Sequence, residues 1–186
     1  MIPGAEMINL SREIVFTAAA VACAALASLY DVRERRIPNL LTGPSIVIAL
    51  AVHLMTGGCK EMATSAVAGL LAGGLLLVFF LAGGLGAGDV KLIAAVGCLT
   101  GLHTLPEVLF ITTLCGALLG VALAIKHQRL GEITLNAMTL LRHHREQGLR
   151  PHPELNIDNA AALRMPFALP ITAGCLISAG MQMWRA

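Results

Sequence analysis

The chain has 186 residues, of which 56% are hydrophobic and only 13% are charged. Soluble domains carry about 25% charged residues, so this composition excludes an ordinary soluble protein. The net charge is +2, and no basic face stands apart from the apolar segments, which argues against nucleic-acid binding. We expect a single domain covering residues 1–186, folded as an all-α, polytopic membrane helix bundle.

Apolar stretches along the chain predict about six transmembrane helices. The first three are expected at Ile14–Tyr30, at about Leu40–Met55 and at about Met62–Leu85. The third contains Gly69, Gly73 and Gly74, small residues that let membrane helices approach each other closely.

The apolar run Val90–Ile125 is too long for one crossing, which takes about 20 residues. Polar residues and a proline at 103–107 predict a turn there. The run then divides into a fourth segment at about Val90–Leu102 and a fifth at about Val108–Ile125.

A polar stretch separates these segments from the last one. Residues 126–164 are expected to form a cytosolic loop, in which Leu130–Leu141 has the pattern of an amphipathic helix lying on the membrane. The sixth transmembrane segment is expected at about Pro166–Trp184.

Positive charge is distributed unevenly between the two ends of the predicted bundle. Ten of the 13 Lys and Arg residues follow the first, third or fifth segment, and the other three are Arg12, Lys60 and Arg185. The positive-inside rule places the richer side in the cytosol. We therefore expect an integral protein of the cell (inner) membrane with both termini outside.

Two acids lie at the cytosolic ends of predicted segments. Asp31 directly follows the first segment, and Asp89 directly precedes the fourth. Ionisable groups at membrane depth are energetically costly and usually functional. Two neighbouring carboxylates cannot both ionise readily, so such a pair would share a proton and activate a water molecule. This is the chemistry of an aspartic peptidase, with Asp31 and Asp89 as the catalytic residues.

Each acid also has a purely structural explanation. Asp31 would pair with Arg35 one helical turn on, and Asp89 would be the N-cap of the fourth segment. Gly86 and Gly88 make either a simple turn or room for a substrate strand beside Asp89. A non-enzymatic scaffold or transporter is the alternative function, although the internal repeat typical of transporters is not evident.

Metal ligands are poorly represented in the sequence. The five cysteines form no CxxC pair, which argues against a zinc site. His143, His144 and His152 are an alternative metal site, but adjacent histidines without an acid at ligand spacing are a weak pattern. We expect neither a metal nor a cofactor.

Three motifs resemble those of one family, the type IV prepilin peptidases, which are GxGD aspartic peptidases of the A24 type. Asp31 followed by Ile37-Pro38-Asn39 resembles their first-aspartate motif, and GAGDVK at 86–91 resembles their GxGD motif. The stretch MPFALP at 165–170 resembles the motif that opens their last span, with Ala-Leu where Gly-Pro is often found. The resemblance covers nearly the whole chain.

The resemblance implies a membrane endopeptidase that removes the basic leader of prepilins or pseudopilins at the cytosolic membrane face. Its implied partners are the prepilin substrate, membrane lipids and the pilus or secretion assembly machinery. Carried over by position, the catalytic residues are Asp31 and Asp89, and the supporting ones are Gly86, Gly88, Lys91, Pro38 and Asn39.

Larger members of the family carry a cysteine-rich cytosolic segment that is linked to N-methylation. This chain lacks that segment, so it is more similar to the short peptidases of Tad/Flp pilus systems, and we predict peptidase without methyltransferase activity. Tyr30-Asp31 also resembles presenilin-like GxGD peptidases, which leaves a non-pilin substrate open. Ile37-Pro38-Asn39 favours the prepilin group.

Overall fold

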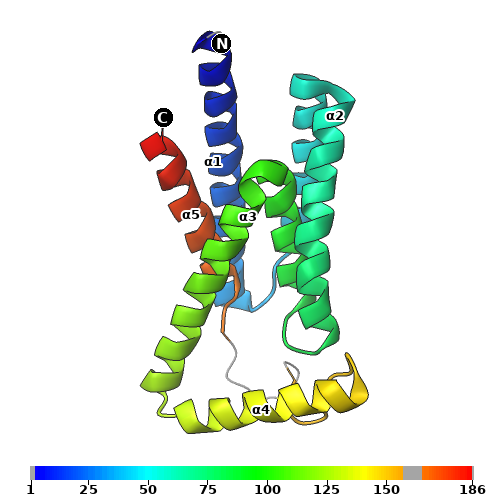
Figure 1. Ribbon diagram of the computed structural model, residues 1–186, viewed down its shortest axis with the longest axis vertical. Coiled ribbons are helices and arrows are strands. Elements are labelled where there is room, and N and C mark those ends of the chain that lie inside the picture. The colour runs from blue at the N-terminus through cyan, green and yellow to red at the C-terminus, as the bar shows by residue number, and fades with distance from the viewer. Residues whose placement is uncertain (1–2, 157–164, 186) are drawn as a thin grey trace.

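The computed structural model describes residues 3–156 and 165–185. The described residues form five helices: α1 (Pro3–Glu34), α2 (Asn39–Leu81), α3 (Ala87–Lys126), α4 (Leu130–Gln147) and α5 (Ala168–Arg185). Figure 1 shows α1, α2, α3 and α5 gathered in a bundle, while α4 crosses below one end of it. Both chain termini lie at the opposite end. The expected all-α helix bundle is confirmed.

Two of the helices fold back on themselves at a glycine. Gly58 in α2 has φ 73° and ψ −169°, and Gly101 in α3 has φ 72° and ψ 175°. Glycine adopts positive φ readily because it has no Cβ. Each helix therefore consists of two arms, and Figure 1 shows both hairpins closing toward the end that holds the termini.

The sequence located one of these reversals correctly. Gly58 falls in the predicted gap between the second and third apolar segments. The break predicted at 103–107 was wrong, because these residues are helical and the reversal is at Gly101. Pro106 is tolerated near the start of the second arm, where few backbone N–H groups have helical partners.

Within the described residues, three helices are long and apolar enough to cross a membrane: Arg12–Glu34 within α1, and the whole of α2 and of α3. The predicted number of about six crossings is not confirmed by this criterion. One reason is that α2 and α3 are each counted once, although each has two arms. The other is that α5, found where the sixth segment was expected, is not among the three.

The second arm of α2 packs closely against the first arm of α3. A Cβ added to Gly73 would lie 3.0 Å from the Cβ of Ala94, and one added to Gly69 would lie 2.9 Å from the Ala94 carbonyl oxygen. Gly74, in contrast, faces open space. Two of the three glycines singled out in the sequence therefore form the helix contact.

The contact is made from the α3 side by small residues as well. A Cβ at Gly97 would lie 2.8 Å from the carbonyl oxygen of Ala68. The hydroxyl of Ser65 donates a hydrogen bond of 2.6 Å to the carbonyl of Cys98. Close packing and interhelical hydrogen bonds hold membrane helices together, because lipid provides no hydrophobic driving force between them.

Polar side chains join α1, α3 and α5 toward the end that holds the termini. Thr17 donates to the side-chain oxygen of Gln182 at 3.0 Å, and the Gln182 amide donates to Thr104 at 3.5 Å. Arg185 pairs with Glu107 at 2.9 Å. The two bonds of Gln182 satisfy buried polar groups and so fix the position of α5 against α1 and α3, while the Arg185–Glu107 pair is exposed.

The α2–α3 contact can be tested with two adjacent glycines. Gly73→Val should lower the free energy of unfolding by about 1–3 kcal/mol, because it overpacks the interface. Gly74→Val is the matched control and should have little effect, since its side chain meets no neighbour. Thermal unfolding in detergent micelles measures both variants, and equal losses would contradict the packing described here.

Candidate active site

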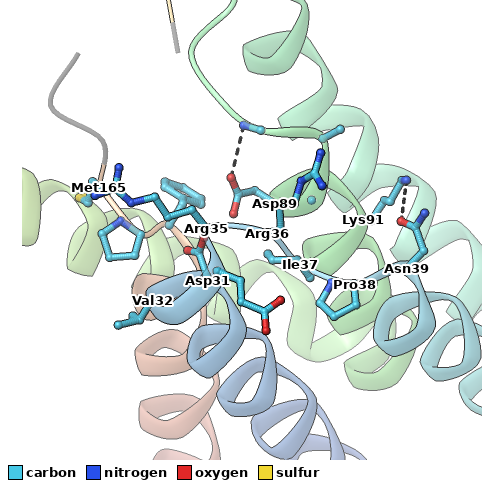
Figure 2. A pocket seen from close by; sticks show the side chains of 16 residues that line it. Asp31, Val32, Arg35, Arg36, Ile37, Pro38, Asn39, Asp89, Lys91 and Met165 are labelled. Carbon is cyan, nitrogen blue, oxygen red and sulfur yellow. Dashed lines mark hydrogen bonds between the residues drawn. The ribbon is translucent and has the colours of Figure 1, made fainter. Parts of the chain in front are cut away.

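Asp31 and Asp89 come together at the end of the bundle that α4 crosses. Asp31 lies in the last turn of α1, and Asp89 lies in the first turn of α3. Both line one pocket of about 830 Å³, and Figure 2 shows the two carboxylates side by side in it. They are close enough for the charge of Asp31 to act on Asp89.

Asp31 is held by the beginning of α5. Its Oδ2 accepts a hydrogen bond of 3.4 Å from the backbone N–H of Ala168, the first residue of that helix. A helix N-terminus presents free N–H groups that favour a negative charge. The structural explanation of Asp31 is not borne out, since no ion pair joins it to Arg35 within the described residues.

Asp89 is held by its own loop. Its Oδ2 accepts a hydrogen bond of 3.3 Å from the backbone N–H of Gly86, which is the N-cap of α3. Asp89 is therefore not the N-cap itself, but it does satisfy a free N–H at the start of the helix. The bond fixes one carboxylate oxygen of Asp89 and leaves the other available to the pocket.

The pocket combines charged and apolar walls. Glu34, Arg35, Arg36 and Lys91 line it together with the two aspartates. Its apolar lining consists of Val32, Ile37, Pro38, Ala87, Met165, Pro166 and Phe167. Its volume is within the range of sites that enclose small ligands, so it has room for several residues of an extended peptide.

Two contacts tie the loop between α1 and α2 to the start of α3. A Cβ added to Gly88 would lie 3.1 Å from the Cβ of Ile37, so the glycine permits this close approach. Lys91 donates a hydrogen bond of 2.9 Å to the side-chain oxygen of Asn39 (Figure 2). The supporting residues predicted from the two motifs thus meet at the pocket, and Pro38 lines it between them.

Several pocket residues were not singled out in the sequence. Glu34 and Arg36 lie within five residues of Asp31, and Arg35 was considered only as an ion-pair partner of Asp31. Charged residues at the end of a membrane helix are common and gave no specific signal of a pocket. Met165 and Phe167 lie in the third motif, which marked the segment without indicating that it reaches Asp31. That contact spans 137 positions, and local patterns do not report it.

The three histidines of the polar stretch do lie together. The ring centroid of His143 is 5.5 Å from that of His144 and 4.8 Å from that of His152. Nδ1 of His152 accepts hydrogen bonds from the backbone N–H groups of Glu154 and Leu155, so it shapes the local turn. Among the described residues, no group of three His, Cys, Asp or Glu side chains has the arrangement needed to hold a metal.

Fold and site define a membrane protein with paired carboxylates at one end of a helix bundle. The model of the type IV leader peptidase family matches residues 18–121. This match includes both aspartates and more than half of the chain, so the chain belongs to the type IV leader peptidase family. The family and the three apolar helices together indicate a protein of the inner membrane.

Curated relatives agree with this family. The prepilin leader peptidase/N-methyltransferase of Burkholderia pseudomallei (strain 1026b) is 35% identical over 109 residues, which cover 53% of this chain and 35% of the relative. The protein of the same name from Aeromonas hydrophila is 36% identical over 103 residues, covering 51% and 35%. The chain thus spans about a third of the length of these relatives. No solved structure matches it significantly.

A cross-link can test the geometry of the pocket. Cysteines introduced together as Ile37→Cys and Gly88→Cys should form a disulfide under mild oxidation, because their Cβ atoms would lie about as close as in a native disulfide. Ile37→Cys with Gly84→Cys is the control and should stay reduced. Mass spectrometry of the digested protein identifies the linked peptides, and absence of the link from the first pair would refute the contact.

Proposed function

We propose that the chain is an aspartic endopeptidase that removes the leader peptide from type IV prepilins or pseudopilins. The single observation that carries this proposal is the meeting of Asp31 and Asp89, from two separate motifs, in one pocket. Family membership supports peptidase activity, and the names of the relatives support prepilins as the substrate class.

The proposed reaction needs only the two carboxyl groups and a water molecule. The pair shares one proton, because two neighbouring carboxyl groups do not both ionise readily. The ionised carboxylate takes a proton from the water molecule while the water oxygen attacks the scissile carbonyl carbon. The protonated carboxyl donates its proton to the carbonyl oxygen. As the C–N bond breaks, the first carboxyl passes the proton it took from water to the amine nitrogen, and the second carboxylate takes a proton back from the gem-diol hydroxyl as the new carboxyl group forms.

The hydrogen bonds of the two acids suit this chemistry. Ala168 and Gly86 each donate one backbone N–H, so each carboxylate is oriented by a fixed element and not by a mobile side chain. Such preorganisation reduces the cost of bringing water and carbonyl into line. Lys91 and Asn39 act as positioning residues in this proposal, because their bond ties the start of α2, which follows Asp31, to the start of α3, which carries Asp89.

We also infer a six-span topology with the pocket facing the cytosol. The two arms of α2 and the two arms of α3, with α1 and α5, would supply six crossings. The excess of Lys and Arg at the end with the pocket supports the cytosolic assignment. The site would then meet a prepilin at the membrane face from which its leader projects.

The catalytic assignment predicts that Asp31→Asn and Asp89→Asn each reduce prepilin cleavage by at least about 10²–10⁴-fold, because each removes a proton acceptor or donor. The assay co-expresses a prepilin and follows the shift of its band on a gel. Glu61→Gln, an exposed carboxylate of α2, is the control and should cleave normally. Full processing by either aspartate variant, inserted at normal levels, would refute the assignment.

A chelator distinguishes this mechanism from a metal-dependent one. Purified enzyme treated with a strong chelator should keep its full activity, because the proposed chemistry draws only on carboxyl groups and water. Loss of activity that returns with added zinc would instead implicate the histidines near position 143. The measurement is the initial rate of prepilin cleavage before and after dialysis.

A further inference from the structure

Helix α4 has an apolar face with no protein cover. Leu130, Ile133, Ala137 and Leu141 recur at intervals of three and four residues, so they lie along one side of the helix. No residue of α4 is buried, and the side chain of Leu141 is 64% exposed. An uncovered apolar stripe of this kind indicates a surface that meets something outside the chain.

The charges of α4 are arranged around this face. Glu132 and Glu146 are separated by two heptads with Thr139 midway, which places all three on the side away from Leu141. Arg145 follows Leu141 by four residues and therefore borders the apolar face. Acids on the far side and cations beside the apolar stripe match an anionic lipid surface better than a neutral protein groove.

The direction of α4 agrees with such a surface. Figure 1 shows α4 running crosswise to α1, α2 and α3, at the end of the bundle where α1 ends and α3 begins. Because those three helices are the ones apolar enough to cross a membrane, α4 runs roughly parallel to the membrane plane. This is the orientation of an interfacial helix.

We propose that α4 binds the surface of the leaflet next to the pocket. Leu130, Ile133 and Leu141 enter the lipid at headgroup level. Arg145, which borders this face, and Arg142, one turn before it on the same flank, contact anionic headgroups. The proposal rests on the membrane character of the bundle and does not require peptidase activity.

Attachment of α4 to the membrane would also affect the loop between α2 and α3, which leads to Asp89. After α4 the chain turns at Gly148, and residues 151–156 return to the loop between α2 and α3. A Cβ added to Gly83 in that loop would lie 3.0 Å from Pro151 and 3.3 Å from Asn156. Because Gly83 lies just before Gly86, the segment after α4 supports the loop that leads to Asp89.

Tryptophan probes on opposite faces of α4 can test the proposal. In a Trp184→Phe background, which removes the native tryptophan, Leu141→Trp places a probe on the apolar face and Thr139→Trp places one opposite. The proteins are reconstituted in phosphatidylcholine vesicles with brominated acyl chains, with or without phosphatidylglycerol. Fluorescence reports lipid contact as a blue shift and a loss of intensity.

The proposal expects Leu141→Trp to be blue-shifted and quenched, more so with phosphatidylglycerol, and Thr139→Trp to emit as in water. Adding Arg142→Ala and Arg145→Ala should remove the extra blue shift and quenching that phosphatidylglycerol causes in Leu141→Trp. Quenching of both probes alike, or of neither, would overturn the proposal. A blue-shifted but unquenched probe in Leu141→Trp would also overturn it and would point to a protein partner. Because this experiment measures no cleavage, its result does not depend on whether the proposed peptidase function is correct.

Discussion

The contact between the second arm of α2 and the first arm of α3 determines where the rest of the molecule can lie. Gly69 and Gly73 meet Ala94, and Gly97 meets Ala68, so the two backbones approach each other closely. Ser65 adds a hydrogen bond across the same interface. This contact fixes the start of α3, and with it the position of Asp89 relative to the other helices.

The pocket is built from helix ends that lie at the same end of the bundle, and the contact between α2 and α3 holds the start of α3 among them. The loop before α2 rests on Gly88 and is tied to α3 by the bond from Lys91 to Asn39. The beginning of α5 completes the arrangement by donating the Ala168 N–H to Asp31. Three segments far apart in sequence therefore contribute to one small volume, and backbone N–H groups orient its two carboxylates.

Much of this could be predicted from the sequence because the strongest signals were local. Long apolar stretches marked α1, α2, α3 and α5, and the motifs around Asp31 and Asp89 marked the two acids. The reversal in α3 was misplaced because His103 and Pro106 are typical of turns, while a single glycine such as Gly101 is common inside membrane helices. The bond from Ala168 to Asp31 was beyond prediction, since no periodicity reports a backbone contact between the first and last helices.

The bond between Ala168 and Asp31 also has a consequence for the order in which the site is completed during synthesis. Asp31 and Asp89 are both synthesised before α5. Until α5 packs against α1, the first carboxylate lacks the N–H that orients it. The finished geometry thus depends on α5 being in place, and a nascent chain that has already inserted both acids but not α5 still presents an incomplete site.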